Sequence, residues 1–135
     1  NIPKYDIFAY FLPTCPFIKS DSIKKGISML DDYTDSVVSV SYYEEPIQLA
    51  CIKKNDHIIP IFDNLTSGLT NSKFIQKYVK PNGGFYISKW DNLLNNKNFF
   101  KGNVKGVEIP NDILVDIDYE SDLKKAEFMI QNNLI

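Results

Sequence analysis

The chain has 135 residues and a mass of 15.5 kDa, and 44% of its residues are hydrophobic, which is enough to build one packed domain. Its formal net charge of −2 and its pI near 5.3 exclude a protein that coats nucleic acid, because that function requires a basic face. No run of about 18 apolar residues occurs, so we expect no membrane span and a cytoplasmic protein.

The first part of the chain has the pattern of strand, helix and strand. Residues 6–12 are almost wholly apolar and end at a Pro-Thr-Cys-Pro loop, which predicts a central strand buried on both faces. We expect Ser20 or Asp21 to cap a helix that runs to about Asp31, before a second strand at residues 36–41. This order is typical of a parallel α/β crossover, whose ligands bind beyond the carboxyl ends of the strands.

A hairpin is expected next. Apolar residues 47–52 and 57–62 flank the polar turn at residues 53–56, and the only histidine, His57, lies at the edge of that turn. Exposed apolar hairpins commonly contact a partner, so we interpret residues 42–73, approximately, as a dimerisation arm. The alternative, a hairpin that packs on its own domain, stays open.

The rest of the chain predicts further short elements. A strand at residues 85–87 follows Asn82-Gly83-Gly84, where two glycines either turn the chain or let its backbone approach a ligand. A short helix is expected at residues 88–95, strands at residues 104–109 and 113–117, and a last helix capped by Ser121.

The chemistry-bearing residues are few. Cys15 and Cys51 each lie beside apolar residues, which predicts buried and inert thiols in a reducing compartment. With one histidine, His57, catalytic triads and histidine-based metal clusters are excluded. Asp116 and Asp118 lie two positions apart at an expected strand end, so they share one face and could hold Mg²⁺ with water and phosphate. Alternatively, these acids only cap the helix that follows.

Several separated segments agree with one family in order and spacing. They are Phe11-Leu12-Pro13-Thr14-Cys15-Pro16-Phe17, Asn82-Gly83-Gly84-Phe85-Tyr86-Ile87, Phe99-Phe100, and Asp116-Ile117-Asp118 with Asp122. Over nearly its whole length the chain resembles the carboxyl-terminal part of the nonulosonic acid cytidylyltransferases, which join CMP from CTP to sialic acid and related nine-carbon sugars. The resemblance implies an α/β fold of the nucleotide-diphospho-sugar transferase type. Its sheet would be Rossmann-like, mostly parallel and three-layered, with a hairpin arm that forms a homodimer.

The resemblance also implies an activity and a site. The reaction would be Mg²⁺-dependent nucleotidyl transfer from CTP to a sialic, pseudaminic or legionaminic type of acid, giving the CMP-sugar and pyrophosphate. Asp116 and Asp118 would be the catalytic metal ligands. The substrate-binding residues would be Thr14, Lys73, Asn82, Gly83, Gly84, Tyr86, Phe99 and Phe100. Among them Asn82 and Tyr86 would contact the sugar, while the two phenylalanines would either wall its side chain or belong to the core.

This chain departs from the family pattern at three places. The sialate branch has glutamine where Leu12 lies here, which favours pseudaminic acid, legionaminic acid or a related sugar. Lys73 lies near the position of an arginine in relatives and offers a point charge in place of a bidentate fork. The family's glycine-rich basic nucleotide loop would lie upstream of these residues. We therefore expect a domain without its first third, or one member of a split pair, that is inactive alone.

Two alternatives come from other functional classes. A non-catalytic interaction module could keep the sheet and the hairpin without the nucleotide loop. A glycosyltransferase could use the Asp-x-Asp motif for its metal, but those enzymes generally carry it mid-domain, and here it lies near the end of the chain.

Overall fold

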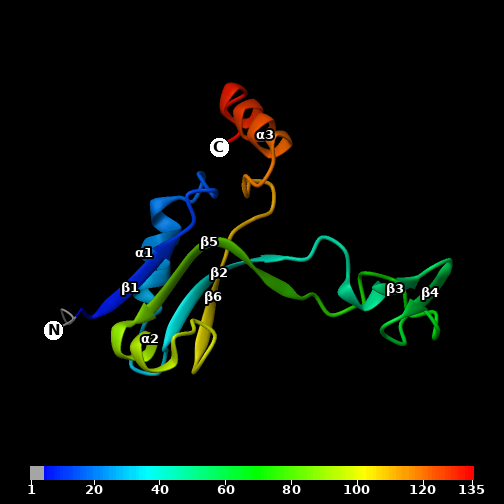
Figure 1. The fold of residues 1–135 in the computed structure, drawn as a ribbon, viewed down its shortest axis with the longest axis horizontal. Helices are drawn as coiled ribbons and strands as arrows, with labels where there is room; N and C mark the ends of the chain where they lie inside the picture. Colours follow the sequence, from blue (N-terminus) through cyan, green and yellow to red (C-terminus); the bar gives the residue numbers. More distant parts are fainter. Residues whose placement is uncertain (1–4) are drawn as a thin grey trace. The chain divides into compact units, whose positions relative to one another are not determined.

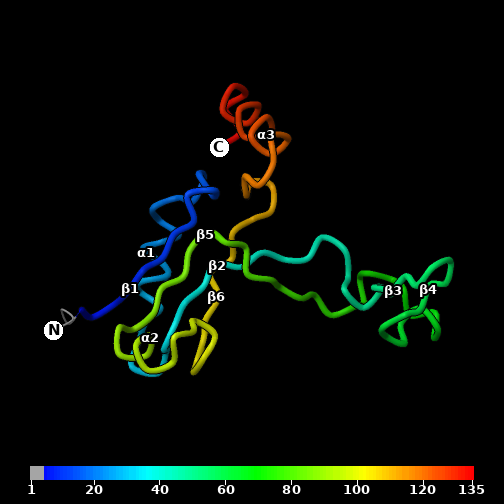
Figure 2. Tube along the Cα trace, in the orientation of Figure 1, coloured from blue at the N-terminus to red at the C-terminus, as the bar shows by residue number. Residues whose placement is uncertain are grey.

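The computed structural model describes residues 5–135 as a mixed α/β protein with two compact units (Figure 1). The first unit runs through Ser41 and resumes at Pro81–Ile135, and the second unit is Tyr42–Lys80. The chain thus leaves the first unit once and returns to it, as the tube shows (Figure 2). No helix in residues 5–135 is long and apolar enough to cross a membrane.

The first unit is built on a four-stranded sheet in the order β1-β5-β2-β6. The strands are β1 (Ile7–Phe11), β2 (Ser36–Tyr42), β5 (Val79–Lys89) and β6 (Val104–Glu108). β1 pairs antiparallel with β5, whereas β2 pairs parallel with β6. Hydrogen bonds join Ser36 to Ser88 and Ser41 to Asn82, so β2 and β5 also run in opposite directions.

The predicted α/β class is confirmed, but neighbouring strands are mostly antiparallel where the sequence predicted a mostly parallel sheet. The reason is β5, which lies between β1 and β2 and opposes both. β1 and β2 still point the same way, with α1 (Ser20–Ser28) between them in the chain. β1, α1 and β2 therefore form the predicted parallel crossover, with the antiparallel β5 inserted between the two strands. The carboxyl ends of β1 and β2 still lie at the same edge of the sheet.

A core between α1 and the sheet holds the first unit together. Gly26 of α1 lies directly on β5, since a Cβ there would come within 2.9 Å of the Phe85 ring. The most buried side chains of this core are Val37, Phe85, Ile87, Val107 and Ile109. A smaller cluster joins Val115 to Ala126 and Met129 of α3 (Glu120–Gln131). The remaining helix, α2 (Trp90–Asn96), follows β5 directly.

Three predictions about strands and burial are wrong. β1 is an edge strand, and Ile7, Tyr10 and Phe11 on it are exposed, because an apolar run alone does not distinguish a central strand from an edge. Residues 113–117 form a turn and irregular backbone with no ladder partner. Cys51 is exposed, since β3 has no covering layer within its unit, while the predicted burial of Cys15 is confirmed.

The predicted helix caps are also wrong. α1 begins after Lys19 and has no side-chain cap, so neither Ser20 nor Asp21 fills that role. α3 begins after Tyr119, so its cap lies two residues before the predicted Ser121. The carboxylate of Asp122 accepts hydrogen bonds from the backbone N–H groups of Asp118 and Tyr119, which fixes the entry into α3.

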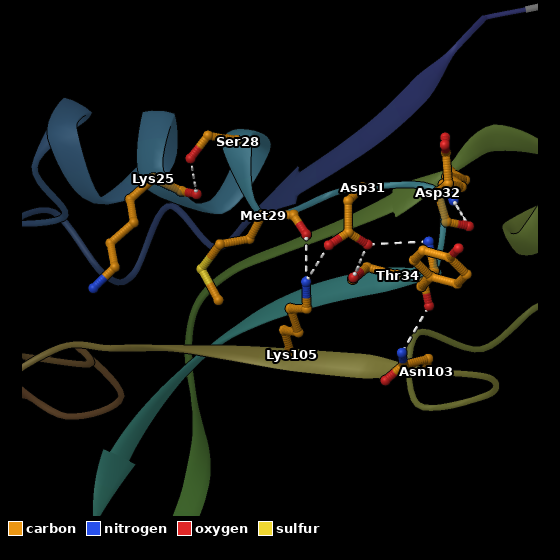
Figure 3. A network of polar contacts seen from close by, with 10 residues as sticks. Lys25, Ser28, Met29, Asp31, Asp32, Thr34, Asn103 and Lys105 are labelled. Carbon is orange, nitrogen blue, oxygen red and sulfur yellow. Dashed lines mark hydrogen bonds and ion pairs between the residues drawn. The ribbon is translucent and has the colours of Figure 1, made fainter.

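A polar network fixes the loop between α1 and β2 against β6 (Figure 3). Asp31 lies 2.6 Å from the Lys105 Nζ and accepts hydrogen bonds from the Thr34 hydroxyl and the Tyr33 N–H. The hydrogen bond from Lys105 is the chief cause that lowers the pKa of the Asp31 carboxyl to about 2. This network lies where β2 and β6 begin, at the edge of the sheet opposite the strands' carboxyl ends.

The second unit contains the predicted hairpin. It consists of β3 (Cys51–Lys54) and β4 (His57–Pro60), preceded by a 3₁₀ turn at Ile47–Leu49. Asn55 in the turn has a φ of 52°, a left-handed conformation that asparagine tolerates better than most residues. The hairpin prediction is confirmed, and the strands are shorter than the apolar runs that indicated them.

Candidate functional site

The candidate site forms where three separate segments meet beside the end of β1. The loop after β1 carries Thr14 and Cys15, and its Thr14 carbonyl accepts a 2.9 Å hydrogen bond from the Ile117 N–H. The Cys15 thiol points to the carbonyl of Asn82 at 3.8 Å. Segments far apart in the sequence are therefore joined within the first unit, at the edge of the sheet where the crossover rule places ligands.

The two acids share one side of their segment. Val115 is buried and Ile117 is half-buried, and both pack in the α3 cluster, whereas Asp116 and Asp118 are exposed. This alternation places both carboxylates on the solvent side although the segment is not a strand. The two carboxylates share one face, as predicted, because the neighbouring Val115 and Ile117 pack inward, and not because the segment pairs in a sheet.

Gly83 lies at the centre of the site with a φ of +79°. A Cβ added to it would lie 2.9 Å from Leu12 Cδ1, 3.5 Å from Asp116 Oδ2 and 3.6 Å from Cys15 Sγ. Both its backbone conformation and its surroundings therefore favour glycine. The backbone of β5 consequently passes close to the Asp116 carboxylate.

Burial and the charges of Asp116 and Asp118 raise the pKa of the Cys15 thiol. Burial, followed by the charge of Asp116 and a hydrogen bond with its carboxylate, raises the pKa of Cys15 to about 11, and Asp118 adds to the shift. Both carboxylates therefore act on the same thiol. At neutral pH Cys15 is protonated and donates a hydrogen bond, so it is a poor nucleophile.

The side chain of Asn82 is 7% exposed and its hydrogen bonds go to the protein. Its Oδ1 accepts from the Ser39 hydroxyl and from the Gly84 N–H at 3.2 Å, and its Nδ2 donates to the Ser41 hydroxyl at 2.8 Å. The Ser41 hydroxyl in turn donates to the Ile109 carbonyl. This amide therefore holds the turn that contains the two glycines.

Aromatic rings adjoin the acids. The Tyr86 ring lies 5.4 Å from Phe99, 6.3 Å from Phe100 and 6.2 Å from Tyr10, measured between centroids. Burial raises the pKa of Tyr86, and the neighbouring Cys15 and Asp116 raise it further. Tyr86 thus connects the acidic segment with the aromatic surface.

Nine of the ten predicted site residues come together in the first unit: Thr14, Asn82, Gly83, Gly84, Tyr86, Phe99, Phe100, Asp116 and Asp118. Lys73 belongs to the second unit, where it lines a cavity of about 730 Å³ together with Tyr43 and Tyr78. Another cavity of about 650 Å³, lined by Asp35 and Lys89, lies at the opposite end of the sheet. At the candidate site, Asp116, Asp118 and Phe100 are exposed.

Sequence reasoning missed the residues that support the turn and extend its apolar side. Ser39 and Ser41 were interpreted only as part of an alternating strand pattern, yet both are fully buried and bind Asn82. Tyr10 was assigned to a buried strand. Serines that alternate with valines in a short strand were the available signal, because a buried hydroxyl requires a partner.

The donor set fits a hard divalent cation that keeps part of its own ligands. Among residues 5–135, no group of three or more His, Cys, Asp or Glu side chains could hold a metal ion by itself. Asp116 and Asp118 offer exposed carboxylate oxygens, and Mg²⁺ is commonly bound by one or two carboxylates plus water and substrate phosphate. The residues therefore fit Mg²⁺ shared with a phosphate ligand.

A scan against protein-family models found no match, and a search of curated proteins found none either.

Proposed function

We propose that this chain carries the metal-binding and sugar-binding part of a cytidylyltransferase that transfers CMP from CTP to a nine-carbon acidic sugar in the cytoplasm. The finer fold that goes with this proposal is a Rossmann-like sheet of the nucleotide-diphospho-sugar transferase type. The three co-oriented strands β1, β2 and β6 are consistent with it.

One observation carries the proposal. The segments that resemble the family are far apart in the sequence, yet the Ile117 N–H binds the Thr14 carbonyl, and Asp116 lies against Gly83. Such convergence is not expected if each motif had only a local role in a turn or a cap. It supports one site that contains two carboxylates, a glycine turn and an aromatic surface.

Each part of the site has a role in this mechanism. Mg²⁺ held by Asp116 and Asp118 would neutralise the negative charge that develops on the phosphates as pyrophosphate leaves. The exposed acids bind and orient, and the Gly83 backbone allows close approach. Asn82 acts through the turn, because its amide is used within the protein. Tyr86, Phe99 and Phe100 would wall the sugar, with Thr14 and Gly84 at its edge.

Metal binding tests the proposal directly. Mn²⁺, added with CTP as a paramagnetic stand-in for Mg²⁺, should broaden the amide NMR signals of Thr14, Gly83 and Asp116–Asp118. Asp118→Asn should abolish this broadening and leave the remaining spectrum intact, since the side chain is exposed. Asp112→Asn, an exposed acid on the preceding loop, is the matched control and should bind like the wild type. Unchanged broadening in an Asp116→Asn/Asp118→Asn variant would rule out the metal site.

The hairpin supports the proposal that the protein is a homodimer. All four residues of β3 and three of the four in β4 are exposed, and Ile58 is 68% exposed. An isolated two-stranded hairpin is marginal in water, so contact with a second copy would stabilise it.

A second candidate function, a non-catalytic interaction module, is favoured by the same exposed hairpin. It predicts no binding of Mn²⁺ or CTP by the first unit, so the experiment above separates the two functions.

A further inference from the structure

β1 is the outermost strand of the four-stranded sheet and has β5 on its paired side (Figure 1). Among residues 5–135, no other strand pairs with it. Folded proteins usually protect such an edge with a charge, a proline or a bulge inside the strand. All five residues of β1, Ile-Phe-Ala-Tyr-Phe, are apolar or aromatic, and their register with β5 is unbroken. The free edge of β1 is therefore able to accept a further strand.

The hydrogen bonds of β5 show which backbone groups of β1 point to this edge. The Trp90 N–H donates to the Asp6 carbonyl at 3.0 Å. The next amide, the Lys89 N–H opposite Ile7, donates in the other direction, to the residue that precedes β2. Bonded and non-bonded pairs alternate along an antiparallel ladder. The N–H and C=O groups that point to the free edge are therefore those of Ile7, Ala9 and Phe11.

We propose that β1 pairs antiparallel with β1 of a second copy of this chain, about a two-fold axis at Ala9. Such a contact must be complementary to itself, residue by residue. Ile7 then lies opposite Phe11 of the other copy, and Ala9 lies opposite Ala9, so each outward-pointing backbone group gains a partner. An axis at Phe8 or Tyr10 would leave one outward-pointing residue of β1 without a strand residue opposite it.

The side chains fit the same register. Ile7 is 37% exposed and Phe11 is 43% exposed, and they share a face with Ala9, which packs on the core. Across the axis these two apolar side chains would cover each other. On the opposite face, Phe8 and Tyr10 would form an aromatic cross-strand pair. No charged residue lies within β1, so no like charges meet. Apolar side chains that are exposed in one copy are thus covered in the pair.

Amide hydrogen exchange tests this pairing, measured by NMR in an Ile58→Lys variant so that the hairpin contributes little to association. At about 1 mM, where even a weak interface is populated, the outward-pointing amides of β1 should exchange at least about 2-fold more slowly than at about 0.05 mM. The amides of Phe8 and Tyr10 face β5 and should exchange equally at both concentrations. Concentration-independent exchange of the outward-pointing amides would overturn the pairing.

Substitutions within β1 supply a second measurement, by sedimentation equilibrium at about 1 mM. Ala9→Pro removes an N–H that faces the free edge and keeps the ladder with β5, so adding it to Ile58→Lys should leave only monomer. Adding Phe11→Lys should do the same, because it places a charge on the edge. Phe128→Lys changes another exposed aromatic residue, on α3, and is the matched control that should still associate. Association that survives both Ala9→Pro and Phe11→Lys, or an Ile58→Lys variant that is monomeric at every concentration, would refute the proposal.

Discussion

At the scale of single residues, the candidate site depends on side chains that do not face solvent. Asn82 is the clearest case, because its side-chain amide makes hydrogen bonds to Ser39, Ser41 and Gly84. Sequence reasoning gave Asn82 a direct contact with the sugar. In the structure this amide shapes the backbone that a ligand would meet.

Asn82→Ala should destabilise the first unit by about 1–3 kcal/mol, because it leaves the Ser39 and Ser41 hydroxyls with lost partners in the interior. Urea unfolding measures the change. Asn95→Ala is the matched control, because Asn95 is exposed on α2, and it should leave the midpoint nearly unchanged. Equal midpoints for Asn82→Ala and the wild type would show that the network contributes little to stability.

Asp31 makes a second residue-scale prediction, on pH. Its pKa is lowered from 3.8 to about 2 by Lys105 first and then by Thr34, so its contribution to stability is present above pH 4 and is lost as the pH falls toward 2. Lys105→Met should therefore lower the thermal midpoint at pH 7, and the difference from the wild type should shrink toward pH 2.

Lys24→Met is the control for Asp31, because the pair Lys24–Asp21 is far more exposed than Lys105–Asp31. It should change the midpoint little at any pH, since surface ion pairs contribute little. A gap between Lys105→Met and the wild type that stays constant from pH 7 to pH 2 would show that Asp31 is not the group that titrates.

At the scale of elements, local patterns predicted most helices and strands but not their neighbours. Hydrophobic alternation and turn residues indicated β2, β6 and the hairpin, and amphipathic spacing indicated α1 and α3. The place of β5 between β1 and β2 depends on pairing between distant residues, which no local pattern contains. Residues 113–117 have the composition of a strand, yet Val115 packs on α3 instead of joining the sheet.

The site was predictable to the extent that its residues carry motifs. The acids, the glycine pair and the aromatic residues Tyr86, Phe99 and Phe100 were predicted from sequence, and they come together in the first unit. Ser41 and Tyr10 were not identified, because a buried serine and an exposed edge tyrosine follow from the order of the strands and not from spacing.

A prediction about β5 concerns Gly83, where the backbone of this strand passes close to Asp116. Gly83→Ala should destabilise the protein by about 1–2 kcal/mol through its positive φ, with a further cost from contact with Leu12. Adding Leu12→Ala to Gly83→Ala should remove only the part of the destabilisation that comes from the steric contact with Leu12. A double-mutant cycle from denaturant unfolding measures this coupling, and strict additivity of the two changes would show that Leu12 does not crowd the site.

At the scale of the whole molecule, the chain consists of two units that differ in how much apolar surface each buries. The first unit buries a core between α1 and its sheet. The second unit, Tyr42–Lys80, leaves most apolar side chains of its hairpin exposed. A unit of this size rarely supplies enough buried surface alone, so it should gain stability from association.

The proposed homodimer predicts that Ile58→Lys dissociates the protein. A charge introduced on the exposed hairpin strand would have to be desolvated in the interface, which should weaken association by at least 10-fold. Analytical ultracentrifugation across a concentration series measures this. Ile130→Lys, at an exposed position on α3, is the control and should associate as the wild type does. Wild-type protein that stays monomeric at all concentrations would contradict the arm.

The only tryptophan, Trp90, gives the molecule a built-in spectroscopic reporter. Its ring lies 5.3 Å from Tyr5 and 6.1 Å from Phe8, at the far end of the aromatic surface that leads through Phe99 to Tyr86. Its fluorescence therefore reports on the first unit, to which Trp90 belongs, whereas backbone circular dichroism reports on both units. Melting curves that coincide by the two methods would mean that the units unfold as one cooperative body, and curves that separate would mean that each has its own stability.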